Sequence, residues 1–344
     1  MKMELQIIWF VLWSVLWAVY FMLDGFVLGT AMLSGLLGKT DMEKRILLNS
    51  VGPVWNGNEV WLITAGGATF AAFPTTYALM FSYLYTALLL LLFALIIRGV
   101  ALEFRGKVDN ASWKSSFDKA IIISGFVPAL LFGVAFGNIF AGLPMDNAGY
   151  HGSLLKLLNP YGLITGVLFV LLFAVHGALY ACVKTSGELS SRAKNLAGNL
   201  WIPLLVAAVI FLGYTKFATR LYDNYFRWPL FLFIPAIAVA ALIAVKYFTV
   251  RGAMLKAFAA SCVTILFVTF TGVAGLFPNL IPSSIDPAYN LTIFNSSSSS
   301  YTLAIMTIVA LIFVPVVIVY KIWVYRLFGA KVEQKDVLNN SEAY

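Results

Sequence analysis

The stretch that decides the fold is Val51-Gly-Pro-Val-Trp-Asn-Gly-Asn-Glu-Val-Trp-Leu-Ile-Thr-Ala-Gly-Gly67. It opens an apolar segment of membrane-spanning length, yet it places Asn56, Asn58 and Glu59 inside that segment. A carboxylate at the centre of a membrane helix costs about 2.5 kcal/mol or more, so such residues usually mark functional sites. The stretch therefore predicts a membrane helix with a polar strip that serves a function.

The residues around Glu59 give this helix two different faces. Asn56 lies three positions before Glu59 and is expected to share its face. Trp55 begins the motif and is expected to pack or to make a specific contact there. Gly66 and Gly67 are small enough to let another helix approach closely. The polar strip and the small residues behind it predict a buried polar path between packed helices, and Trp61 is the second flanking tryptophan.

The composition of the whole chain fits a membrane protein. The 344 residues are 61% hydrophobic and 11% charged, and the mean hydropathy is +0.89. Soluble domains carry about 25% charged residues. The net charge of +8 is therefore assigned to loops at the membrane surface and not to nucleic-acid binding. The two cysteines, Cys182 and Cys262, are expected to be small buried apolar residues, and they form no metal motif.

Hydropathy predicts an all-α polytopic membrane protein with about nine spans, each near the roughly 20 residues that a bilayer requires. The predicted spans are 6–37, 51–73, 77–101, 118–141, 160–183, 197–215, 229–249, 254–277 and 302–327. The first span is long enough to tilt or to protrude from the bilayer. The loop 142–159 is modest in length, and the loop 278–301 is expected to lack regular structure because it is rich in proline and serine.

The basic residues predict the orientation. With alternate loops assigned to opposite sides, 18 of the 23 lysines and arginines fall on one side. The other five are Lys2, Lys156, Lys216, Arg220 and Arg227. Because basic residues concentrate in cytoplasmic loops, the N-terminus is predicted outside and the C-terminus in the cytoplasm.

Asp24 is a second acid inside a predicted span. Gly25 and Gly29 follow it and predict close packing against a neighbouring helix. Asp24 and Glu59 lie about 20 Å and 14 Å from the cytoplasmic ends of consecutive helices, at 1.5 Å per residue. They are therefore expected to lie close together. Asp24 is interpreted either as a structural carboxylate or as part of a proton or ion path.

A third polar group, Arg98, Glu103 and Arg105, lies at the cytoplasmic end of the third span. It fits a basic helix end whose side chains reach the membrane surface. Alternatively, Arg98 and Glu103 form the mouth of a route to Glu59 and Asp24. Because burial favours the protonated form of a carboxylate, such a chain of acids suits proton uptake, and it also suits Na⁺ binding.

His176 lies in the fifth span and His151 in an outer loop. Two isolated histidines cannot supply the axial ligands of several haems. His176 is expected to make a polar contact within the bundle, with a single haem ligand as the alternative. The sequence shows no catalytic motif and no metal-binding motif.

The motifs resemble those of subunit II of the cytochrome bd quinol oxidases. The resemblance extends over the whole chain in order. It is carried by Leu47–Gly67, Asp24-Gly-Phe, Arg98-Gly-Val with Glu103 and Arg105, Phe132-Gly-Val-Ala-Phe-Gly-Asn138 on to Pro144, Lys184-Thr-Ser-Gly-Glu-Leu189 and Phe277-Pro-Asn-Leu-Ile-Pro-Ser283.

The resemblance implies one membrane domain, 1–344, in two four-helix bundles, 1–141 and 160–277, plus a peripheral ninth helix, 302–327. A weak repeat of the motif around Gly133–Pro144 at Gly272–Pro282 agrees with this arrangement. The resemblance also implies the cell membrane of a prokaryote and a haem-free, non-catalytic subunit. A partner, subunit I, would hold b-type and d-type haems, oxidise quinol and reduce O₂ to water. Some members add small single-helix subunits or a structural quinone.

The family's subunit II is thought to supply a cytoplasmic proton path, which assigns Asp24, Asn56, Glu59, Arg98 and Glu103 to that path here. The motif residues Trp55, Asn58, Trp61 and His176 are assigned structural roles. Several members carry Asp where this chain has Asn56, and this chain carries Glu59 one turn later. We interpret this as a carboxylate moved by one turn. A secondary transporter that binds a proton or cation is the alternative function, and a purely structural scaffold is another.

Overall fold

The structure, a computed structural model, describes residues 2–339 and 344. It is predominantly α-helical. The helices are α1 (Lys2–Leu37), α2 (Asp41–Val51), α3 (Trp55–Ala72), α4 (Pro74–Tyr83), α5 (Tyr85–Phe104), α6 (Ala111–Ala141), α7 (Pro160–Lys184), α8 (Gly187–Ala218), α9 (Leu221–Arg227), α10 (Phe233–Val250), α11 (Met254–Leu276), α12 (Ser300–Leu327) and α13 (Gln334–Leu338). The all-α membrane fold predicted from the sequence is confirmed.

Eight segments in the described residues are long and apolar enough to cross a membrane. Seven are the helices α1, α5, α6, α7, α8, α11 and α12, and the eighth is Pro229–Val250, which includes α10. The expected span 51–73 corresponds to α3, which has 18 residues but carries its polar motif in its first turns. The expected span 77–101 is not one helix. Pro74 begins α4, which ends at Tyr83, and α5 begins at Tyr85. The helix is therefore interrupted at Leu84.

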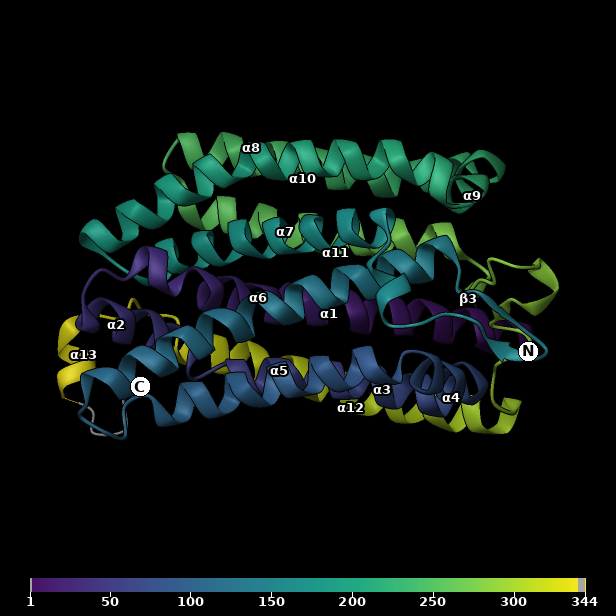
Figure 1. The fold of residues 1–344 in the computed structure, drawn as a ribbon, viewed down its shortest axis with the longest axis horizontal. Helices are drawn as coiled ribbons and strands as arrows, with labels where there is room; N and C mark the ends of the chain where they lie inside the picture. Colours follow the sequence, from purple (N-terminus) through teal and green to yellow (C-terminus); the bar gives the residue numbers. More distant parts are fainter. Residues whose placement is uncertain (1, 340–343) are drawn as a thin grey trace.

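The long helices run side by side (Figure 1). α8 and α10 form one side of the molecule, and α3, α5 and α12 form the other. α1 lies between them and contacts α3 and α6 as well as α7 and α11. Because α1 packs on helices of both proposed bundles, the division into two four-helix units stays a prediction.

The two ends of this helix array differ (Figure 1). The N-terminal end carries the start of α1, α9 and β3, and the opposite end carries α2 and α13. We call the latter the basic end, because the loops with most lysines and arginines lie there.

Glycines set one helix crossing as expected. A Cβ on Gly29 would lie 1.9 Å from the Phe173 carbonyl oxygen, and one on Gly177 would meet the backbone of Gly29. The close packing predicted beside Asp24 is therefore confirmed, between α1 and α7. The same expectation for Gly66 and Gly67 is wrong within the described chain, because a Cβ at either position would meet no atom within 4 Å.

Short strands hold the loops at the N-terminal end. β1 (Met145–Asp146) pairs with β2 (Gly149–Tyr150), and β3 (Asn279–Ile281) pairs with β4 (Leu291–Thr292). The two loops meet where Ser283 Oγ donates to the Met145 carbonyl at 2.6 Å. The expectation that 278–301 lacks regular structure is therefore wrong. Its polar side chains bond to backbone groups and fix the loop, for example Asn290 Oδ1, which accepts from the Ser283 N–H.

Candidate functional site

The two intramembrane acids meet on one arginine. Arg98 of α5 is fully buried, and its Nη1 donates to both carboxylate oxygens of Asp24 at 3.0 and 2.9 Å. Its Nη2 donates to Oε1 of Glu59. The Asp24 side chain is fully buried, whereas 23% of the Glu59 side chain is exposed. The expectation that Asp24 and Glu59 lie close together is confirmed.

Neighbouring polar groups hold this cluster in place. Tyr20, one turn before Asp24 on α1, donates its hydroxyl to Asp24 Oδ2 at 3.1 Å. Asn58 of α3 is buried and donates to the Leu23 carbonyl at 2.8 Å. The Tyr325 hydroxyl of α12 donates to Asn58 Oδ1, also at 2.8 Å. Asn58 therefore connects α1, α3 and α12 beside the acids, which fits its assignment as a structural residue.

The structure places two of the predicted residues differently from the sequence. Both interpretations of Arg98 put it at a helix end, but it lies inside the protein because a buried Asp24 requires a nearby cation. Asn56 does not join the cluster: it is exposed and makes no hydrogen bond with the described residues. Trp61 is buried in the apolar core.

His176 makes polar contacts within the bundle, as expected. Its Nε2 lies 2.9 Å from the Met22 carbonyl, and its Nδ1 lies 2.7 Å from Ser261 Oγ. The ring stacks on Phe258, with 4.8 Å between centroids. Because both ring nitrogens are engaged, His176 fits a structural residue and not a haem ligand.

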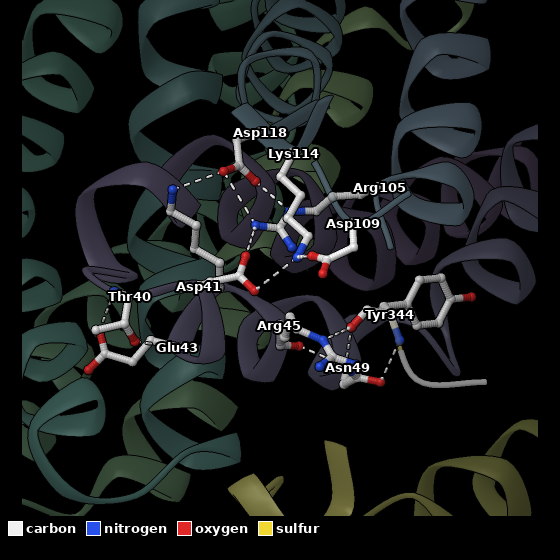
Figure 2. Close-up of polar contacts among 11 residues, drawn as sticks. Thr40, Asp41, Glu43, Arg45, Asn49, Arg105, Asp109, Lys114, Asp118 and Tyr344 are labelled. Carbon is white, nitrogen blue, oxygen red and sulfur yellow. Dashed lines mark hydrogen bonds and ion pairs between the residues drawn. The ribbon is translucent and has the colours of Figure 1, made fainter. Parts of the chain in front are cut away.

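Glu103 lies exposed at the basic end, where Tyr344 contacts it. The Tyr344 hydroxyl donates to Glu103 at 2.8 Å and lies 3.4 Å from Trp55 Nε1. The backbone carbonyl of Tyr344 accepts from Arg45 and Asn49 (Figure 2). Sequence patterns do not predict this contact, because more than 200 residues separate Tyr344 from Glu103.

A second buried arginine stabilises the basic end (Figure 2). Arg105 is 1% exposed and donates to Asp118 at 2.5 Å and to Asp41 at 2.8 Å. Nearby, Glu43 accepts hydrogen bonds from Arg192 and from backbone N–H groups. Burial alone would raise the pKa of Glu43, but these hydrogen bonds outweigh burial and the pKa lies below its usual value. These pairs fix α2 to α5, α6 and α8.

An apolar cavity of about 740 Å³ lies between α3, α4, α5 and α6 and is lined by Gly66, Gly67 and Trp17. Trp17 is 8% exposed, and its Nε1–H has no acceptor among the described residues. The cavity explains why the two glycines meet no neighbouring helix. It has the size and apolar lining of a small-molecule site, with one unsatisfied donor.

Residues 2–339 and 344 contain no group of three or more His, Cys, Asp or Glu side chains that could hold a metal ion. The fold and the buried cluster thus define a multi-pass membrane protein built around two acids that share one arginine. Comparison with known proteins makes this more specific. The sequence profile of cytochrome bd terminal oxidase subunit II matches residues 5–328. The chain belongs to this family, and it is a subunit of a quinol:oxygen oxidoreductase complex.

Individual relatives cover nearly the whole chain. A probable cytochrome oxidase subunit 2 of Haemophilus influenzae is 37% identical and covers 94% of both chains. A cytochrome bd ubiquinol oxidase subunit 2 of Bacillus subtilis is 35% identical, over 97% of this chain and 98% of that one. The cytochrome bd-I ubiquinol oxidase subunit 2 of Escherichia coli is 34% identical over 98% of both.

The fold has a solved counterpart. A chain of the bd oxidase from Geobacillus thermodenitrificans superposes with a TM-score of 0.78 over 94% of this chain and 98% of that one, at 18% identity. The comparisons confirm the predicted family and imply a bacterial multi-pass membrane protein with a subunit I partner. The lack of a candidate metal site in the described residues agrees with a location of the haems outside this chain.

Proposed function

We propose that this chain supplies protons from the cytoplasm to the oxygen-reducing haem of its partner, along Glu103, Glu59 and Asp24. The basic end then lies in the cytoplasm and the N-terminus outside, in the inner membrane of a bacterium. The observation that carries the proposal is the cluster of Asp24, Arg98 and Glu59 inside the helix array.

The charge of the cluster suits the binding of one proton. Two carboxylates and one guanidinium leave one negative charge when both acids are ionised, and such a charge is costly away from water. Uptake of one proton makes the cluster neutral. Glu59 is the acid that exchanges this proton, because it is partly exposed and bonded to Arg98 through one oxygen. Asp24 accepts two hydrogen bonds from Arg98, keeps the arginine in place and is the next acid on the route after Glu59.

Glu103 and Tyr344 form the entrance in this scheme. Glu103 lies five residues after Arg98 on α5, about 7.5 Å nearer the basic end at 1.5 Å per residue. The Tyr344 hydroxyl connects Glu103 to the Trp55 ring at the start of α3. Glu59 follows one turn further along α3, so the route proceeds from one helix end toward the middle of the membrane.

The partner covers the face of α3 and α12. Asn56 is exposed and Glu59 is partly exposed on α3, and both would be unfavourable against lipid. Lys321 of α12 lies against Gly57 beside them. Most side chains of α12 are not covered by the rest of this chain, because only 6% of the residues in its most apolar stretch are buried. A protein surface with polar groups can form hydrogen bonds with these side chains, whereas acyl chains cannot. Subunit I provides this surface. A small single-helix subunit would add to the same complex.

The apolar cavity suits a structural quinone. A quinone carbonyl would accept the unsatisfied Trp17 Nε1–H, while the apolar walls would contact the ring and tail. A Trp17→Phe variant keeps the apolar surface and removes the donor. It is expected to lower the quinone content of the purified complex, measured by extraction and chromatography. Wild-type content would exclude this role for Trp17.

Two measurements test the function. A tag on this chain should co-purify subunit I with the visible spectrum of b-type and d-type haems. In that complex, Glu59→Gln and Asp24→Asn should slow quinol-driven O₂ consumption. The matched control is Asp109→Asn, which neutralises an acid that is 98% exposed at the basic end and lies outside the proposed route. Ion flux by this chain alone, without co-purified haem, would instead favour the transporter. Wild-type O₂ consumption in both acid variants would exclude the relay.

A further inference from the structure

The N-terminal end of the helix array contains a second pocket, remote from the acid cluster. It has a volume of about 360 Å³ and lies where the end of α6, the start of α7 and the end of α8 meet the loop 278–301. Among the described residues, Lys156 is the one charged residue that lines it, and the lining also includes Tyr150, Tyr214 and Ser284. We propose that this pocket binds a phosphate group, carried by the headgroup of an anionic membrane lipid.

The walls of the pocket are held in place by an amide network. Asn138 is 6% exposed and donates to the carbonyls of Val134 and Leu157, each at 2.8 Å. Its Oδ1 accepts from Asn159 Nδ2 at 2.7 Å. These bonds join α6 to the segment that leads into α7, so the pocket is formed before any ligand binds. Asn159 also caps α7 by accepting from the Gly162 N–H at 2.8 Å.

The groups that remain available in the pocket can all donate hydrogen bonds. The hydroxyls of Tyr150, Tyr214 and Ser284 make no hydrogen bond within the described part of the chain. The Lys156 ammonium makes one hydrogen bond, at 3.3 Å to the His151 carbonyl, and so keeps capacity for an anion. The start of the 25-residue helix α7 adds its positive dipole end.

The surroundings favour a lipid as the carrier of the phosphate. Leu158, Leu163 and Phe217 are 45%, 41% and 82% exposed, and each lies within two residues of a lining residue in the sequence. A lipid would place its phosphate on Lys156 and its acyl chains along these apolar side chains. A cationic pocket beside an exposed apolar surface offers contacts to both parts of an anionic lipid, its phosphate and its acyl chains.

The test is lipid binding by the purified oxidase complex, measured by native mass spectrometry. Phosphatidylglycerol is compared with phosphatidylcholine of the same acyl chains. We expect preferential binding of phosphatidylglycerol, reduced about tenfold in Lys156→Gln, because one charge-assisted hydrogen bond is lost. The double variant Tyr214→Phe/Ser284→Ala should weaken binding without changing the charge. Lys216→Gln is the control, since it removes a lysine of the same end that does not line the pocket.

A second arm separates the lipid from free phosphate. Displacement of phosphatidylglycerol by inorganic phosphate would show that the phosphate alone is recognised. Retention of the lipid would show that its glycerol and acyl chains contribute, and both results support the site. Equal binding of the two lipids, or equal losses in Lys156→Gln and Lys216→Gln, would overturn it. The haem spectrum and the oxidase activity verify that each variant complex is intact.

Discussion

Replacing Arg98 with methionine tests the energetics of the acid cluster. Methionine fills a similar apolar volume but leaves Asp24 without its cation. Removing one partner of a buried ion pair costs about 3–5 kcal/mol, because the remaining charge is left uncompensated. Asp24 is fully buried and both of its oxygens accept from Arg98, so the upper part of this range applies. At 1.4 kcal/mol per factor of ten, the folding equilibrium should fall by about three orders of magnitude.

The assay is the thermal unfolding midpoint of the purified complex, determined for a double-mutant cycle. Asp24→Asn/Arg98→Met should recover much of the loss, because it removes the orphaned charge. Glu59→Gln/Arg98→Met should recover less, because Glu59 is 23% exposed and solvent already screens it. An Arg98→Met midpoint equal to that of the wild type would refute this reasoning. Equal recovery in the two double variants would refute the assignment of Asp24 as the more buried acid.

Two further predictions concern helix packing and the basic end. Gly29→Ala should prevent assembly of the complex, because the added Cβ would lie 1.9 Å from the Phe173 carbonyl oxygen. The control Gly66→Ala should assemble normally, because its added Cβ would meet no atom within 4 Å. Co-purification of each variant with the haems of the complex measures assembly. Assembly of Gly29→Ala at wild-type yield would contradict the crossing. Glu43 has a lowered pKa, so its contribution to stability is full above the usual carboxyl pKa of about 4.3 and is lost as the pH falls through its folded value. The wild type should therefore lose more of its unfolding midpoint between pH 6 and pH 3 than Glu43→Gln, and parallel losses would contradict the role of the Arg192 pair.

The sequence predicted the parts of the site that single helices determine. Asp24 and Glu59 stand out because acids are rare inside membrane helices, and their depths along antiparallel helices bring them together. Sequence alone places Arg98, the partner of both acids, at a helix end, because Arg98 lies near the basic residues of the following loop. The direction of its side chain depends on how α5 packs against α1, which the sequence pattern does not show. Tyr20 could have been identified, since it precedes Asp24 by one helical turn.

The difference between Asn56 and Asn58 follows from the way α3 sits against its neighbours. Spacing alone places Asn56 with Glu59, but α3 directs Asn58 toward the Leu23 carbonyl and leaves Asn56 exposed. The contacts of Tyr344 and of the strands β3 and β4 join segments that are distant in sequence or rich in turn residues. Local propensity does not determine such contacts.

Proton uptake during O₂ reduction tests the central claim most directly. The oxidase complex is reconstituted in vesicles with the basic end facing a pH-sensitive dye, and uptake is followed after O₂ is added to the reduced enzyme. The proton-relay account predicts that Glu59→Gln slows uptake at this face by about a hundredfold, the lower end of the range for loss of a proton-transferring group, while the haems are reduced normally. Uptake at the wild-type rate by both Glu59→Gln and Asp24→Asn would contradict it.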